Sequence, residues 1–263
     1  MDRQDVTYLL NSTPKYFYIV ELHVALLRRY APQCKWPVYF ATEVPDDPIC
    51  KILKHYGVNI LTLEKEHSSF LNSRRRALEL LPKTIRYVMP IQEDFLLERY
   101  IDTDAIEDSF NILDSDNSTI AIRYMPCPGP KEINQNVGKF WKVFQERFDL
   151  YLFSFQATMW RKECILMYFR IITNQLDSLG YDETKRNFIE IKQNIAENSD
   201  GQTVYKHLFK DKKTLGYIRK HKYPNAVYMS PWPYRPTAII KGELQDFAKE
   251  LAEREGFTLN SVA

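Results

Sequence analysis

The sequence has little of the cysteine and histidine on which disulfide-rich and zinc-bound domains depend. Its 263 residues include 4 cysteines and 5 histidines. The cysteines are scattered, with no CxxC pair and no Cys/His spacing that would hold zinc. Isolated thiols of this kind are typical of a reduced compartment, so neither a disulfide framework nor a structural zinc site is expected.

Long apolar runs and a large net charge are also missing. No stretch approaches the ~18 uncharged apolar residues of a membrane helix, and the polar start Met1–Asp5 does not resemble a signal region. We therefore expect no membrane span and a cytoplasmic location. Lys and Arg number 36 against 34 Asp and Glu, a net charge of +2. This balance argues against bulk electrostatic binding to nucleic acid and permits only local basic patches.

The chain does contain ample material for a core. Hydrophobic residues make up 44% of the sequence and aromatic residues 14%. No break in composition marks a linker, and no internal repeat is present. We therefore expect a single domain over residues 1–263.

Strand-like and helix-like stretches alternate through the first half of this domain. The expected strands are Val6–Leu10, Trp36–Thr42, Val58–Leu63, Ile85–Ile91 and Thr119–Met125. The expected helices are Phe17–Tyr30, Pro48–His55, Phe70–Leu81 and Asp104–Leu113. Strands separated by helices of this length predict an α/β fold, a mostly parallel central sheet with helices on both faces.

The second half of the chain is less regular. Phe148–Thr158 predicts a further strand, and helices are expected at Cys164–Leu179, at Asn187–Glu197 and at the C-terminus over Gly242–Glu255. The aromatic cluster Tyr223–Tyr234 either forms a stacking wall for a sugar or packs over the sheet, and we favour packing for Trp232.

Polar residues follow three of the strands at their carboxyl ends. Asn11–Thr13 follows the first strand, Glu43 the second and Gln92–Asp94 the fourth. In parallel sheets these ends share one edge, where ligands bind. Carboxylates there can hold Mg2+ or Mn2+, which in turn neutralises a diphosphate. The alternative is a solvated loop start, or a cap for a helix that begins at Phe95.

A run of arginines lies on the helix before the fourth strand. Arg74, Arg75 and Arg76 point in different directions on a helix, so at most two can face one ligand. A guanidinium matches phosphate oxygens and keeps its charge at all ordinary pH values. At least one of the three is expected on a solvated helix face.

The stretch Ser73–Pro82 followed by Arg86–Phe95 resembles the core of inverting family-2-like glycosyltransferases of the GT-A fold. Those enzymes carry an arginine-containing helix and then a hydrophobic strand that ends in a D-x-D-like motif. The resemblance implies a nucleotide-sugar-binding half at residues 1–125 and an acceptor-side half at 126–263. It implies a transferase that moves a sugar from a nucleotide-diphosphate sugar to a hydroxyl of a glycan or small acceptor, with inversion.

The same resemblance implies roles for particular residues. Asp94 would bind Mn2+ or Mg2+, and Glu190 or Glu197 would be the catalytic base. The donor nucleotide and its phosphates would contact Asn11, Ser12, Thr13, Glu43, Arg74, Arg75, Gln92 and Glu93.

Two positions depart from the family pattern. Gln92 stands where the family has an aspartate, and Ile191 stands where a second acid would follow Glu190. An amide binds a cation weakly, so either Asp94 carries most of the metal binding or an arginine replaces the metal. The base could equally be Asp182 or Glu183.

Two other functions compete with the transferase. A non-catalytic nucleotide-sugar or glycan-binding module on the same fold is consistent with Gln92. A nucleotidyltransferase that makes the activated sugar is disfavoured, since Asn11–Pro14 stands where its glycine-rich loop is expected.

Overall fold

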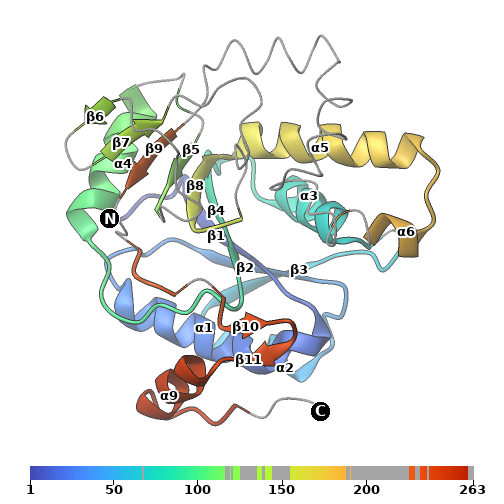
Figure 1. The fold of residues 1–263 in the computed structure, drawn as a ribbon, viewed down its shortest axis with the longest axis horizontal. Helices are drawn as coiled ribbons and strands as arrows, with labels where there is room; N and C mark the ends of the chain where they lie inside the picture. The colour runs from blue at the N-terminus through green and yellow to red at the C-terminus, as the bar shows by residue number, and fades with distance from the viewer. Residues whose placement is uncertain are drawn as a thin grey trace.

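The computed structural model describes most of the first half of the chain and parts of the second (Figure 1). The described residues are 1–66, 68–115, 119, 121–124, 135–137, 140–143, 155–187, 190, 225–228, 232–235 and 237–259.

The helices and strands of the first half follow the predicted order. The strands are β1 Val6–Asn11, β2 Val38–Thr42, β3 Val58–Thr62, β4 Tyr87–Gln92 and β5 Ala121–Arg123. The helices are η1 Pro14–Tyr16, α1 Phe17–Tyr30, α2 Pro48–His55, α3 Phe70–Leu80 and α4 Thr103–Ser115. Local chemistry sets several of these ends. The Asp47 side chain, for example, accepts a hydrogen bond from the Ile49 N–H, and Pro48 opens α2.

The second half adds further strands to the sheet, a separate two-stranded hairpin and three helices in the described residues. Its strands are β6 Gln135–Val137, β7 Phe140–Val143, β8 Thr158–Arg161, β9 Asn225–Tyr228, β10 Ile239–Ile240 and β11 Glu243–Leu244. Its helices are α5 Lys162–Ser178, α6 Glu183–Asn187 and α9 Asp246–Arg254.

One sheet of the order β3-β2-β1-β4-β8-β5-β9-β7-β6 runs through the described structure. Strands β3, β2, β1 and β4 are parallel neighbours, and β8 runs antiparallel to both β4 and β5. Helices α1 and α2 lie on one face of this sheet and α3 and α5 on the other (Figure 1). The predicted α/β fold, with a mostly parallel sheet between two helical layers, is confirmed.

Alternating side chains of β1 build the two cores. Tyr8 and Leu10 pack in the core under α1, whereas Leu9 packs in the core under α3 and α5. Tyr8 contacts Trp36 and Trp232, with ring centroids 5.0 and 5.7 Å away. Trp232 is fully buried, so the packing interpretation of this residue is confirmed.

Element boundaries in the second half differ from the sequence predictions. Strand β8 extends through residues 159–161, beyond the expected strand end at Thr158, and α5 begins two residues earlier than expected. The expected C-terminal helix starts only at Asp246, because residues 239–244 form the β10–β11 hairpin. Gly242 at its tip has φ +87°, a conformation that favours glycine. Most of the predicted helix Asn187–Glu197 lies outside the described residues.

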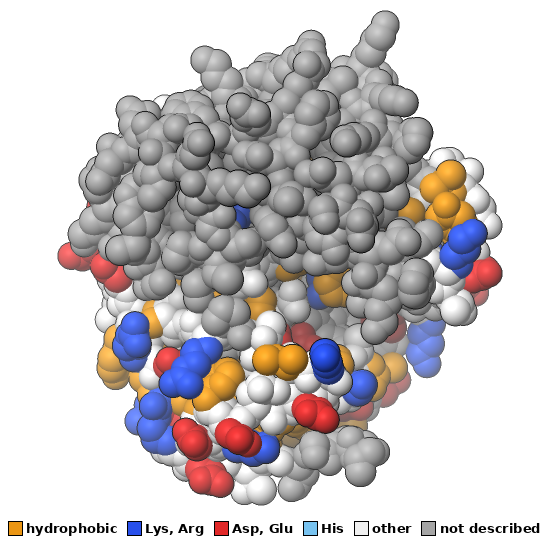
Figure 2. All heavy atoms as spheres, in the orientation of Figure 1, with side chains coloured by type: hydrophobic (Ala, Val, Ile, Leu, Met, Phe, Trp, Pro, Cys, Tyr) orange, Lys and Arg blue, Asp and Glu red, His pale blue; other side chains and the backbone are white. Residues whose placement is uncertain are grey.

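The outer surface of the described part mixes charges of both signs. In Figure 2, acidic and basic side chains lie interspersed over the region where α1 and α9 are placed. None of the helices in the described part of the chain combines the length and apolar character that a bilayer crossing requires.

Candidate functional site

The carboxyl ends of β1, β2 and β4 meet at one edge of the sheet. In the strand register Asn11 pairs with both Gln92 and Ala41, so the ends of the three strands are level. The next residues along the chain are Ser12, Glu93 and, two positions after Ala41, Glu43. The structure therefore brings these predicted site residues to the same edge, as the parallel order requires.

Glu93 and Asp94 are buried acids at this edge. Each is 8% exposed. Burial raises the pKa of Glu93 to about 7, with a further increase from the neighbouring charge of Asp94. Burial likewise raises the pKa of Asp94 to about 6, against a hydrogen bond from the Ile239 backbone N–H. We call Gln92, Glu93 and Asp94 the acidic corner. The positive charge near these two carboxylates does not offset their burial, so both pKa values stay above the ordinary ones.

Arg74 is the cation of α3 that faces the acidic corner. Its guanidinium lies 3.6 Å from the centroid of the Phe70 ring and donates to the Phe70 carbonyl oxygen at 2.9 Å. Burial lowers the pKa of Arg74 to about 10, and the charges of Glu93, Glu190, Glu43 and Asp94 oppose that shift. The side chain therefore stays charged at neutral pH and supplies positive charge close to the corner.

Arg75 points away from the acidic corner. Its guanidinium donates to the Asn72 side-chain oxygen at 2.6 Å and pairs with Glu79 at 3.2 Å on the same helix. Arg76 donates to the Glu64 carbonyl oxygen at 2.7 Å. The three arginines thus diverge as their helical spacing predicts, and Arg74 is the one whose charge lowers the pKa values of both corner acids.

Glu43 contacts α3 beside the corner. The Ser73 hydroxyl donates to its Oε1 at 2.5 Å, and the Arg76 guanidinium lies 3.6 Å from the same oxygen. The nucleotide contact predicted for Glu43 therefore involves a carboxylate that is already held in place by α3.

Ser12 and Thr13 lead from β1 into a helix. A hydrogen bond from the Ser12 side chain lowers the pKa of Glu93, against the larger effect of burial. Thr13 is exposed and precedes η1, and its side chain makes no capping hydrogen bond. η1 opens with Pro14, which has no N–H, and the Tyr16 N–H donates to the Thr13 carbonyl oxygen at 2.8 Å, so this turn offers few free donors to an anion.

Glu190 caps α3 from within the core. It is 2% exposed, and its carboxylate accepts hydrogen bonds from the Leu71 N–H at 2.9 Å and the Ser69 hydroxyl at 3.1 Å. The Arg186 Nε donates to it at 2.8 Å. This carboxylate is already bonded to three donors. Glu197, the other predicted base, lies outside the described residues.

Two neighbours of the corner were missed by the sequence analysis. The Ala238 N–H donates to the Asp94 carbonyl oxygen at 2.8 Å, which attaches the β10–β11 hairpin to the corner. Tyr18 in the first turns of α1 has a raised pKa, caused mainly by burial and in part by Glu93 and Asp94. Tyr18 could have been found from its position soon after the first strand. Nothing in the sequence indicated the hairpin contact.

The acidic corner can hold a divalent cation only when a substrate supplies further ligands. No group of three or more His, Cys, Asp or Glu side chains placed to hold a metal occurs within the described ranges. Mg2+ and Mn2+ are commonly held by one or two carboxylates together with substrate phosphate oxygens. Glu93 and Asp94 fit that mode, because both acids are buried and have raised pKa values.

No protein-family model matches this sequence, and no curated protein matches it. Solved structures match in fold at low identity. One is 4-diphosphocytidyl-2C-methyl-D-erythritol synthase from Anaerococcus prevotii DSM 20548, with a TM-score of 0.48, 11% identity and 96% of each chain covered.

Two glycosyltransferases are among the other matches. S. aureus TarS 1-349 in complex with UDP-GlcNAc has a TM-score of 0.37 and 16% identity, over 62% of this chain and 46% of that one. The mannosyltransferase PcManGT from Pyrobaculum calidifontis, in complex with GDP-Man and Mn2+, has a TM-score of 0.36 and 15% identity, over 46% of this chain and 35% of that one. These two alignments cover less than half of the glycosyltransferase chain that each matches. The likeness is one of fold at low identity, to nucleotidyl- and glycosyltransferases alike.

Proposed function

We propose that this chain is a glycosyltransferase that moves a sugar from a nucleotide-diphosphate sugar to a hydroxyl of a glycan or small acceptor, with inversion. The observation that carries the proposal is the pair of buried acids Glu93 and Asp94, at the carboxyl edge of a parallel sheet, with the positive charge of Arg74 near enough to act on both. A diphosphate with a divalent cation supplies charges that complement this arrangement.

In this proposal the donor nucleotide lies along the edge formed by β1, β2 and β4. Asn11 and Gln92 offer amide groups for hydrogen bonds, and the hydroxyls of Ser12 and Thr13 follow at the end of β1. Asp94 holds Mn2+ or Mg2+ together with the diphosphate, and Glu93 contacts the ribose or orients Asp94. The metal, when bound, stabilises the negative charge of the departing diphosphate.

Arg74 contributes to the same step without a metal. A fixed guanidinium beside the leaving phosphates stabilises the charge that develops on them as the sugar departs. Its pKa of about 10 keeps it protonated at neutral pH. Arg74 therefore supports transfer even if the amide of Gln92 makes metal binding weak.

Inverting transfer also needs a base for the acceptor hydroxyl. Of the two residues that the family resemblance suggests, Glu190 is bonded to Leu71, Ser69 and Arg186 and supports α3. We therefore favour Glu197 over Glu190 as the base, with Asp182 and Glu183 as the alternatives. An E197Q variant that keeps the full transfer rate would remove it from that role.

One observation favours a second candidate, a non-catalytic nucleotide-sugar or glycan-binding module on this fold. Gln92 and Asn11 are paired in the strand register, so two amides occupy the edge where the related enzymes begin their acidic motif. Such an edge can hydrogen-bond a ligand without assembling a strong metal site.

A thermal-shift panel tests both candidates. UDP-, GDP- and dTDP-sugars are added with and without Mn2+, and CMP-sugars serve as the arm that lacks a diphosphate. A transferase and a nucleotide-sugar-binding module both predict stabilisation by one diphosphate nucleotide family. If none of these ligands shifts the melting temperature, both candidates are wrong. Turnover of the stabilising donor then separates them, because only the enzyme forms product, and Asp94→Ala should reduce product formation to what Arg74 alone supports.

A further inference from the structure

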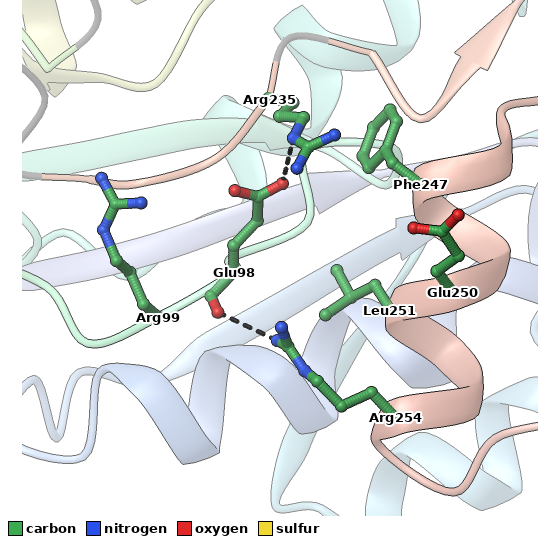
Figure 3. Close-up of a pocket in the computed structure, with 7 residues that line it drawn as sticks. All are labelled: Glu98, Arg99, Arg235, Phe247, Glu250, Leu251 and Arg254. Atoms are coloured by element: carbon green, nitrogen blue, oxygen red, sulfur yellow. Dashed lines mark hydrogen bonds and ion pairs between the residues drawn. The ribbon is translucent and has the colours of Figure 1, made fainter.

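A surface pocket of about 470 Å³ lies beside α9, and the acidic corner takes no part in it. It is built from the segment just after the corner, from Arg235 and from α9. Figure 3 shows three arginines around a central glutamate, with an aromatic ring on the side of α9. The lining contains the arginines Arg99, Arg235 and Arg254, the acids Glu98 and Glu250, and the apolar Phe247 and Leu251.

Two of the arginines are held in place by Glu98. The Arg235 Nε lies 2.6 Å from the Glu98 carboxylate, and its guanidinium lies 4.9 Å from the centroid of the Phe247 ring. The Arg254 Nη2 donates to the Glu98 carbonyl oxygen at 3.0 Å and to the Tyr30 hydroxyl at 3.2 Å. Both side chains are therefore oriented before any ligand arrives, and each keeps further N–H groups for one.

The third arginine has all its donors available. Arg99 is exposed and has no hydrogen-bond or ion-pair partner within the described part of the chain. Arg254 also pairs with Glu255 at 3.0 Å, and Glu255 pairs in turn with Arg29. Four arginines therefore lie among three acids, Glu98 and Glu250 of the lining and Glu255 behind it, which leaves a net positive charge. The Glu98 carboxylate is the resident counter-charge, and its presence weakens the attraction for an incoming anion.

We propose that this pocket binds a phosphate monoester with an apolar ester group. Three guanidiniums on different sides suit the three terminal oxygens of such a phosphate better than the two of a carboxylate. Phe247 and Leu251 offer an apolar wall for the ester group, and 470 Å³ exceeds what a lone ion requires. The inference does not depend on the proposed transferase, because neither Glu93 nor Asp94 lines this pocket.

Titration calorimetry with phenyl phosphate tests this proposal on the full chain. Arg99→Gln removes the arginine that has no partner to lose, and the expected result is roughly tenfold weaker binding. Arg170→Gln, an equally charge-changing substitution at an exposed arginine of α5, should leave the affinity within about twofold. Glu98→Gln removes the resident negative charge and should strengthen binding, which a merely structural role of Glu98 would not do.

Two further ligands test the chemical class. Inorganic phosphate lacks the apolar group, and benzoate offers a carboxylate in place of the phosphate, so both should bind more weakly than phenyl phosphate. The proposal is overturned if phenyl phosphate does not bind, if Arg99→Gln leaves its affinity unchanged, or if benzoate binds as tightly.

Discussion

The carboxylate of Glu190 accepts a hydrogen bond from the backbone N–H of Leu71 at 2.9 Å, and this contact fixes the start of α3. Glu190 also pairs with Arg186, so a buried charge in one part of the chain sets the position of the helix that carries Arg74. A helix N-terminus favours such a negative charge. The relationship connects the stability of the core to the geometry of the acidic corner.

Glu190→Gln is expected to destabilise the protein by roughly 1 to 3 kcal/mol, because it replaces a buried carboxylate that accepts three hydrogen bonds, although Arg186 keeps its ion pair with Asp177. Urea unfolding measures this change. Glu79→Gln removes a carboxylate from exposed ion pairs and should cost less than about 1 kcal/mol. Equal, small effects of both substitutions would contradict the capping role of Glu190.

Arg74 and Arg75 form a matched pair of neighbours that face different ways. Arg74→Gln should weaken binding of the stabilising nucleotide diphosphate by roughly tenfold or more, since a guanidinium bonded to phosphate is lost. Arg75→Gln should leave that affinity within about twofold, because Arg75 pairs with Glu79 and Asn72 instead. Titration calorimetry compares them. Similar losses in both variants would show that the orientation of Arg74 does not matter.

The raised pKa values of the acidic corner make stability depend on pH. Folded Glu93 titrates at about 7 and Asp94 at about 6, above their ordinary values, so the folded chain binds these protons more tightly than the unfolded chain. Their contribution to stability is present in acid and is lost as pH rises through 6 and 7. Glu93→Gln should therefore be more stable than the parent at pH 8, by roughly 1 to 3 kcal/mol.

The same variant should match the parent at about pH 4, where Glu93 is protonated in the folded chain. Groups that the variant and the parent share contribute equally to the pH dependence of both, so the comparison cancels them, including those of opposite sign. One such group is His23, whose pKa burial lowers to about 4. Unfolding curves at both pH values check the expectation, and a stability difference that does not change with pH would count against it.

Metal binding at the corner should release protons. A cation competes with the protons of Glu93 and Asp94, so the affinity for Mn2+ in the presence of the nucleotide diphosphate should rise from pH 5.5 to pH 7.5. Calorimetry in two buffers of different ionisation enthalpy measures the protons released. Asp94→Asn should remove most of this binding while the nucleotide still binds through Arg74. An affinity that is flat across this range would argue against a metal at these carboxylates.

Much of the fold could be predicted from local patterns in the sequence. The bounds of α1 and α2 agree with the prediction to the residue. The signals that set them, helical spacing of apolar residues and the prolines Pro32 and Pro48, depend only on residues close in sequence. The alternation of strands and helices likewise predicted the parallel edge, because short crossover helices permit few topologies. The same order predicted that the polar residues at the carboxyl ends of β1, β2 and β4 lie at one edge of the sheet.

Other features depended on contacts between distant parts of the chain. Spacing alone showed that the arginines diverge, but packing of α3 against the sheet decided that Arg74 faces the acidic corner. Local pattern could not separate a catalytic from a capping role for Glu190, whose partners Ser69 and Leu71 are remote in sequence. The sequence by itself determined which elements form and where polar groups gather. Only the tertiary structure decided which charges are buried together, because burial and pKa depend on neighbours that folding alone brings near.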